Sequence, residues 1–180
     1  MFGVNGITEA MLYFVATLAV FLIILFLLIL FTWKNGVSPT PTTEKMRRAL
    51  LEHLPEIKEG VVVELGSGWG NLLFPLSKKY AHCKVIGYEN SPIPYLFSSL
   101  INHTPNIKIY RHDFFEKSLR EANLIVCFLF PSGMKRLKEK LERELCSGTY
   151  VVSHTYEIPG WEPKETIEVG TSMIYLYEAV

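Results

Sequence analysis

Residues 61–70 read Val-Val-Val-Glu-Leu-Gly-Ser-Gly-Trp-Gly, and this segment decides the fold. A short run of β-branched residues that stops at a glycine cluster predicts a buried parallel strand followed by a loop. Glycine allows a tight turn and lets a ligand approach the backbone without a Cβ in the way. In α/β proteins such a loop lies at the crevice outside the carboxyl ends of the strands, where ligands bind.

Strand and helix patterns alternate after this segment. Further strands are predicted at residues 85–89, 107–110, 123–128 and 149–153. Helices are predicted at about 71–80, from Ser91-Pro92 onward, and after Ser132, which we expect to cap a helix with a solvated charged face. Residues 166–169 and 173–177 predict a closing antiparallel hairpin. The fold class expected is α/β, a Rossmann-like, doubly wound and mostly parallel sheet.

The chain before this domain is apolar. Residues 10–33 carry no charge, and at roughly 1.5 Å per residue a helix of this length crosses the roughly 30 Å core of a bilayer. A secretory signal peptide and a buried core helix are the alternatives. Both are disfavoured, because no basic residue precedes Lys34 and the run is apolar all round. We predict one transmembrane helix at 10–33, after a short N-terminal segment at 1–9.

Positive charges follow this span, at Lys34, Lys45, Arg47 and Arg48, whereas only an acidic residue precedes it. The positive-inside rule therefore predicts that the C-terminal domain faces the cytoplasm, or the matrix in a mitochondrion. Residues 34–41 are expected to form a linker, and residues 42–180 the domain.

A short amphipathic helix opens the domain. Thr42 or Thr43 can cap it, and Met46, Leu50 and Leu54 fall on one face. We expect this face to pack on the domain, with an interfacial membrane helix as the alternative.

Acidic residues lie at or just beyond the ends of three successive predicted strands. Glu64 lies two positions before the first glycine, where it can receive the ammonium of an amino-acid moiety. Glu89, followed by Asn90, ends the second strand and is placed to bind ribose hydroxyls. Asp113 can accept a hydrogen bond from an adenine amine while Phe114 offers its N–H, although a surface-loop carboxylate is the alternative for Asp113. Dinucleotide sites use a related glycine spacing, but a pyrophosphate gains nothing from Glu64. The residues favour a cofactor that bears an amino acid.

These motifs resemble those of class I S-adenosylmethionine-dependent methyltransferases. More narrowly, the chain resembles the single-pass mitochondrial protein-lysine methyltransferases of the adenine nucleotide translocase and the ATP synthase c subunit, with their prokaryotic relatives. The closer resemblance rests on the apolar N-terminal helix and on four motifs, which are Pro41-Thr42-Thr43, Phe128-Leu129-Phe130-Pro131, residues 139–145 and Pro159-Gly160-Trp161-Glu162-Pro163.

The resemblance implies S-adenosylmethionine as the cofactor, S-adenosylhomocysteine as the product, and no metal. The implied cofactor-binding residues are Thr42, Thr43, Glu64, Gly66, Ser67, Gly68, Gly70, Glu89, Asn90, Asp113 and Phe114. We expect Phe128, Phe130 and Pro131 to form the substrate entrance, with plain packing at a strand end as the alternative. His154 and Tyr156 follow the fifth strand and could also reach the site, but we leave them out of the catalytic set, because a lone histidine in such a loop is more often incidental.

The expected function is therefore a membrane-anchored methyltransferase that N-methylates lysine of a membrane-associated protein, with the lipid bilayer as a partner. Nucleic acid is not expected, because residues 128–131 lack the Asp/Asn-Pro-Pro-Tyr pattern of base-modifying relatives. The alternatives are a methyltransferase of a lipid, quinone or other membrane-embedded small molecule, a nicotinamide oxidoreductase, and a non-catalytic tethered nucleoside-binding module.

Overall fold

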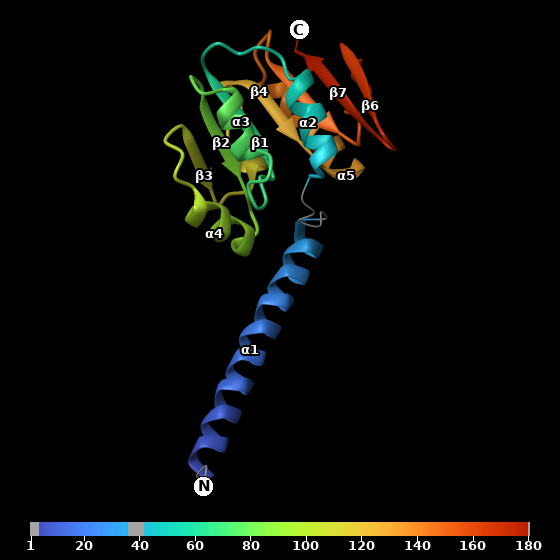
Figure 1. Cartoon of the computed structure of the whole chain (residues 1–180). Coiled ribbons are helices and arrows are strands. Elements are labelled where there is room, and N and C mark those ends of the chain that lie inside the picture. Colours follow the sequence, from blue (N-terminus) through green and yellow to red (C-terminus); the bar gives the residue numbers. More distant parts are fainter. Residues whose placement is uncertain (1–3, 36–41, 180) are drawn as a thin grey trace.

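The computed structural model describes residues 4–35 and 42–179. Helix α1 (Val4–Asn35) extends away from an α/β domain (Figure 1). Within α1, residues Glu9–Leu30 are long and apolar enough to cross a membrane, and the most apolar window is not buried by the domain. From residue 36 onward, the predicted linker lies outside the described residues.

The domain is built on a seven-stranded sheet with the order β3-β2-β1-β4-β5-β7-β6. The strands are β1 (Val61–Leu65), β2 (Lys84–Tyr88), β3 (Ile107–Tyr110), β4 (Ala122–Cys127), β5 (Tyr150–His154), β6 (Glu165–Val169) and β7 (Ser172–Glu178). The first five strands pair in parallel, and β7 runs antiparallel to both β5 and β6. This arrangement confirms the predicted doubly wound sheet and its C-terminal hairpin.

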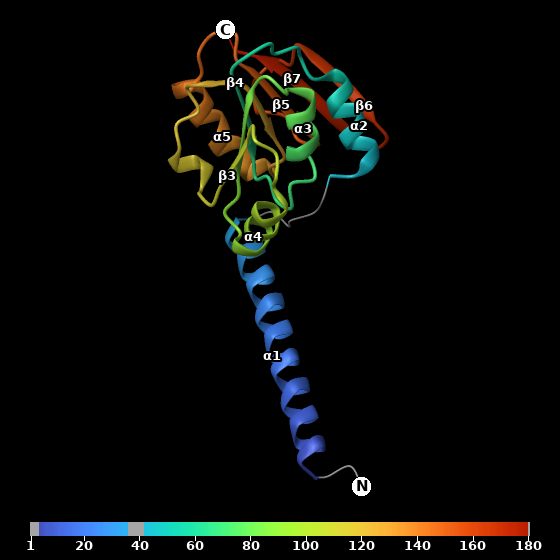
Figure 2. The ribbon, with the colours of Figure 1, turned by 60° about the vertical axis from the view of Figure 1, so that its left-hand side comes forward.

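Helices cover the two faces of the sheet. In Figure 2, α2 (Glu44–His53) and α3 (Leu73–Lys79) lie on one face and α5 (Pro131–Glu144) lies on the other. Helix α4 (Pro92–Ile101) contacts β3 and lies at the end of the domain nearest α1. A short 3-10 helix, η1 (Phe114–Glu116), follows β3.

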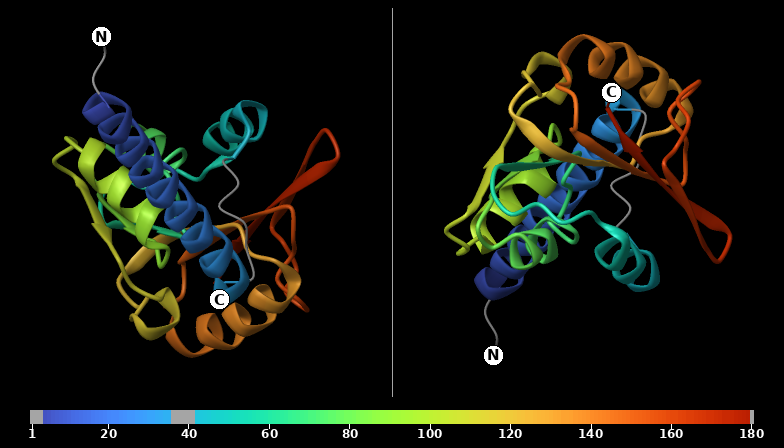
Figure 3. Two further views of the ribbon diagram at one scale, coloured as in Figure 1. Left: turned by 90° about the horizontal axis from the view of Figure 1, so that it is seen from below. Right: turned by 90° about the horizontal axis from the view of Figure 1, so that it is seen from above.

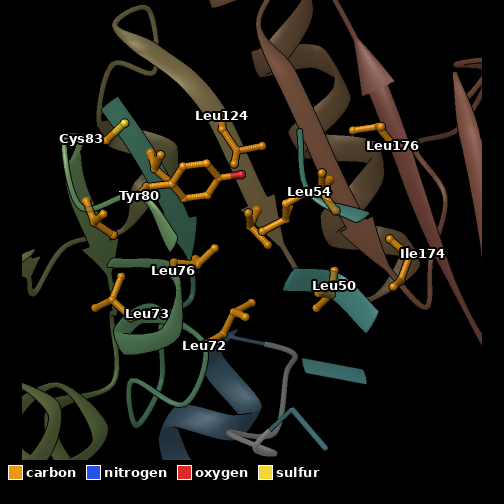
Figure 4. Close-up of a cluster of buried hydrophobic side chains, with 14 of the residues drawn as sticks. Leu50, Leu54, Leu72, Leu73, Leu76, Tyr80, Cys83, Leu124, Ile174 and Leu176 are labelled. Carbon is orange, nitrogen blue, oxygen red and sulfur yellow. The ribbon is translucent and has the colours of Figure 1, made fainter. Parts of the chain in front are cut away.

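Helix α2 packs on the domain, as expected. Its N-cap is Thr43, whose hydroxyl accepts a hydrogen bond of 3.3 Å from the Met46 backbone N–H. Leu50 and Leu54 are buried in the same cluster as Ile174 of β7 (Figure 4). Because the domain covers this apolar face, the alternative of a membrane-surface role for α2 is not supported.

The start of α5 differs from the prediction. The helix begins at Pro131, with Phe130 at the N-cap position, so Ser132 lies inside the first turn and is not the cap. Proline suits the first helical position because its φ is already helical and that position needs no N–H.

The charged face of α5 is also not wholly solvated. Lys140 is only 4% exposed, and its Nζ lies 2.6 Å from Oε1 of Glu144. The other oxygen of Glu144 accepts a hydrogen bond of 2.8 Å from the Leu119 backbone N–H. This ion pair therefore ties α5 to the segment that leads into β4.

Lys140→Ala is expected to lower the free energy of unfolding by roughly 2–4 kcal/mol, because it leaves Glu144 without its cation in a partly buried place. Lys138→Ala is the matched control, since the Lys138–Glu142 pair is longer, at 3.4 Å, and more exposed. Its cost should stay below about 1 kcal/mol. Urea unfolding of the full chain in detergent, followed by tryptophan fluorescence, measures both. Equal losses would contradict a structural role for the buried pair.

Candidate cofactor and substrate site

A cleft lies at the carboxyl ends of the central strands, where doubly wound sheets bind ligands. The predicted site residues that line it are Thr42, Glu64, Gly66, Ser67, Gly68, Glu89, Asn90, Asp113, Phe114, Phe128 and Phe130. Three other predicted residues, Thr43, Gly70 and Pro131, lie outside its lining.

These three residues have local structural roles. Thr43 caps α2, and Pro131 begins α5. Gly70 has a φ of +85°, and a Cβ at this position would come within 2.5 Å of the Phe74 ring. Gly70 therefore allows the loop to pack closely against α3.

The end of β2 holds the glycine loop in place. The backbone N–H groups of Gly66 and Ser67 both donate to the carbonyl of Tyr88, at 2.9 Å each. The N–H of Gly68 donates to the Glu89 carboxylate at 2.8 Å. Gly66 and Gly68 have φ values of +78° and +53°, and an added Cβ at either position would meet no protein atom. The loop is thus fixed on one side and leaves open space for a ligand on the other.

Glu64 is buried in the cleft with an unsatisfied oxygen. The side chain is 7% exposed, and its Oε2 atom has no hydrogen-bond partner among the described residues. Burial, and to a smaller extent the charge of Glu89, raises the pKa of Glu64 well above its usual value. The hydroxyl of Ser67 is likewise buried without a partner. Because a buried unpaired carboxylate costs free energy, the site favours a ligand that carries a cation.

Glu89 joins the loop to the start of α4. One carboxylate oxygen accepts from Gly68, and the other accepts a hydrogen bond of 2.6 Å from the Ser91 backbone N–H. Each carboxylate oxygen has two lone pairs, so Glu89 can still accept hydrogen bonds from hydroxyls of a ligand.

The turn that leads from β3 into η1 also lines the cleft, beside the glycine loop and Glu89. Asp113 caps this turn by accepting a hydrogen bond of 2.9 Å from the Phe115 backbone N–H. The rings of Phe114 and Phe115 lie 4.4 Å apart, and the guanidinium of Arg136 lies 3.8 Å from the centre of the Phe115 ring. The sequence pattern did not indicate Arg136, because it reaches the cleft from α5.

An aromatic cluster forms the other end of the cleft. Phe128 stacks on His154 with a centroid distance of 4.2 Å and an interplanar angle of 12°. Phe130 lies 5.7 Å from the ring of Tyr156. Burial lowers the pKa of His154 to about 4, so the imidazole is neutral at physiological pH.

The structure changes the interpretation of His154, because the residue lines the cleft. Its position is the signal that sequence reasoning could have used. His154 ends β5, and β5 pairs in parallel with β4, which leads directly into Phe128. Parallel neighbours end at the same edge of a sheet, and that edge carries the ligand site. Thr155, the next residue, has a φ of +74°, which is unusual for a residue other than glycine.

Comparisons with known proteins agree with this geometry. The family model described as the ANTKMT methyltransferase domain matches residues 64–165. A protein-lysine N-methyltransferase of Saccharolobus islandicus is 35% identical over 149 residues, which cover 78% of this chain and 92% of that protein. The adenine nucleotide translocase lysine N-methyltransferase of Mus musculus is 29% identical over 67% of this chain, and the match spans 54% of the mouse protein.

A solved structure shares the fold. The RNA methyltransferase from Salinibacter ruber, in complex with S-adenosyl-L-homocysteine, has a TM-score of 0.69, covering 77% of this chain and 93% of that one at 23% identity. The sheet order and this similarity define the Rossmann-like fold of class I methyltransferases.

The chain belongs to the ANTKMT methyltransferase domain family, because the family model covers more than half of it. The relatives from Saccharolobus islandicus and Mus musculus are named as lysine N-methyltransferases. The resemblance read from the sequence is confirmed at the level of the family.

Glu64→Gln is expected to weaken binding of S-adenosylmethionine, the cofactor expected from the sequence, by about 10- to 100-fold. The change removes a charge-assisted hydrogen bond, which is worth about 1.5–3 kcal/mol. It should not destabilise the ligand-free protein, since it removes a buried unpaired carboxylate. Calorimetric titration and urea unfolding measure the two effects, with the exposed Glu121→Gln as control. Unchanged affinity in Glu64→Gln would contradict the assignment of Glu64.

The stability of the protein should also depend on pH through His154. Its folded pKa, about 4, lies below the ordinary value of 6.5, so the unfolded chain binds more protons between these values. The contribution of His154 is present above pH 6.5 and is lost as the pH falls towards 4. Relative to His154→Gln, the wild-type free energy of unfolding should fall by about 3 kcal/mol between pH 7 and pH 4. A difference that does not change with pH would contradict a buried neutral imidazole.

Proposed function

We propose that this protein is anchored in a membrane by α1 and transfers a methyl group from S-adenosylmethionine to a lysine side chain of a membrane-associated protein. The observation that carries the proposal is the polarity of the cleft. One end holds the buried carboxylates of Glu64 and Glu89, and the other holds the aromatic cluster around Phe128 and His154.

The acidic end suits the proposed cofactor. Glu64 would receive its ammonium, Glu89 its ribose hydroxyls, and Asp113 with the Phe114 N–H its adenine. S-adenosylmethionine supplies a methyl group on a sulfonium that is already an excellent leaving group. The protein therefore needs to bind the cofactor, orient the acceptor and exclude water.

The aromatic end suits a lysine amine. The lysine has to lose a proton to solvent before it can act as a nucleophile, and an apolar entrance favours the neutral amine over the ammonium. Phe130 is 37% exposed, so it stands at the mouth of the cleft, whereas His154 is buried within it. A neutral imidazole can accept a hydrogen bond from the amine and so hold it in line with the methyl group.

The membrane assignment rests on α1 and on the charges that follow it. We place the membrane span at residues 10–33, the linker at 34–41 and the catalytic domain at 42–180, facing the cytoplasm or the matrix. The mouse relative is named for the adenine nucleotide translocase. That name supports a protein lysine as the acceptor here.

The test is methyl transfer from labelled S-adenosylmethionine by the full chain, reconstituted into proteoliposomes together with the membrane proteins and lipids of its source as the substrate. We expect the label in protein, recovered as Nε-methyllysine after hydrolysis, and no transfer by Glu89→Ala. Label recovered in the lipid extract would instead identify a lipid or quinone methyltransferase and contradict the lysine proposal.

Phe130→Ala is expected to lower the rate of transfer by roughly 10- to 100-fold, because the acceptor loses its positioning at the mouth of the cleft. Pro131→Ala is the matched neighbour. Pro131 lies outside the cleft lining, so its variant should keep most of the activity. Full activity of Phe130→Ala, with unchanged cofactor binding, would rule out the entrance role of Phe130.

A further inference from the structure

Helix α4 exposes its large apolar residues and buries its small ones. Pro94 and Ser98 are its buried residues. Its exposed residues are Leu96, Phe97, Leu100 and Ile101, with exposed fractions of 65%, 47%, 74% and 43%. A surface helix of a soluble domain shows the reverse pattern, with the apolar stripe towards the core. This apolar face of α4 is therefore suited to contact something other than water.

The position of α4 indicates what covers this face. Helix α1 contacts α4 and passes across it in the view from below (Figure 3). Leu27 and Leu28 of α1 are half-buried, whereas the other side chains of the candidate span, at residues 9–26, 29 and 30, are exposed. The candidate membrane span, Glu9–Leu30, thus ends next to α4. If this span crosses a bilayer, α4 stands at the surface of the same bilayer.

The chemistry of α4 also favours lipid. Its sequence, Pro-Ile-Pro-Tyr-Leu-Phe-Ser-Ser-Leu-Ile, contains no charged residue. A bilayer interface needs only apolar area from a helix that lies in it, and anionic headgroups add binding when the helix is basic. We propose that α4 is an interfacial helix that binds the lipid surface and holds the domain against it. This proposal rests on the membrane anchor of the proposed function and adds a second membrane contact to it.

Contact between α4 and the lipid surface would also orient the cleft. Phe97 of α4 packs edge-to-face against Trp69, with a centroid distance of 5.4 Å, and Trp69 lines the cleft. The helix begins directly after Ser91, whose N–H is held by Glu89. A bilayer in contact with α4 therefore lies close to the wall of the cleft. The acceptor class that fits is a lysine at the membrane surface, within reach of a cleft held at that level.

Single-cysteine labelling of the full chain can test the membrane anchor α1 and the lipid contact of α4 separately. Cys83 and Cys127 are buried, and Cys146 is exposed. Strand β7 ends on the side of the domain away from α1 (Figure 1), and the N–H of Gly148, two residues after Cys146, donates to the carbonyl of Ala179 directly after β7. A fluorophore is attached at Cys146, or at Leu18→Cys or Leu100→Cys in a Cys146→Ser background. Each protein is placed in phosphatidylcholine vesicles that contain nitroxide-labelled lipids.

We expect lipid quenching at residues 18 and 100 and only aqueous quenching at residue 146. The label at residue 100 should lie roughly 5–10 Å below the headgroups, and its quenching should not change with salt, because α4 carries no charge. Lipid quenching at residue 18 but not at residue 100 would contradict the lipid contact of α4 and leave the membrane anchor α1 supported. Absence of lipid quenching at both residues would contradict the membrane anchor α1 and, with it, the lipid contact of α4. A label at residue 100 that is shielded from both quenchers would show a protein partner or a second copy on α4, which also overturns the proposal.

Discussion

The hydrogen bonds between the glycine loop and the end of β2 determine the geometry of the site. Two N–H groups of the loop meet the carbonyl of Tyr88, and a third meets the carboxylate of Glu89. They hold Gly66 and Gly68 open towards the cleft and bring the ends of β1 and β2 together. As a result, Glu64 and Glu89 lie in one buried pocket, where burial raises the pKa of Glu64. A buried carboxyl group with an unpaired oxygen is stabilised when a cation binds beside it, so the ligand-free site suits a positively charged ligand.

The fold and the acidic end of the cleft could be predicted from the sequence because their signals are local. The strand and glycine cluster at 61–70, the acids at the ends of the first three strands and the closing hairpin are all read from short windows. The remaining features depend on tertiary neighbours. Nothing near Lys140 in the sequence shows that it is buried. Gly66 and Gly70 belong to one glycine motif in the sequence, and only the structure shows that Gly70 packs against Phe74. His154 becomes part of the site only because β5 lies next to β4.

The proposed enzyme brings its acceptor and its cleft together through the membrane. An anchor confines both partners to one surface, which raises their effective concentration without any further contact. The exposed apolar residues of α4 would then fix the height and tilt of the domain, which a single helix with a linker does not. The entrance, with Phe130 at its mouth, would lie at the level where lysines of membrane proteins meet water.

The most direct measurement is the number of protons released when S-adenosylmethionine binds the full chain, taken in steps from about pH 5 to pH 7, where the amino group of the cofactor is protonated. Calorimetric titration in buffers of different ionisation enthalpy gives this number. We predict net proton release within this range, because an ammonium beside Glu64 lowers the pKa that burial raises in the ligand-free site, and we predict that Glu64→Gln abolishes it. Binding without proton release, or equal release by Glu64→Gln, would contradict the central role of the buried carboxylate.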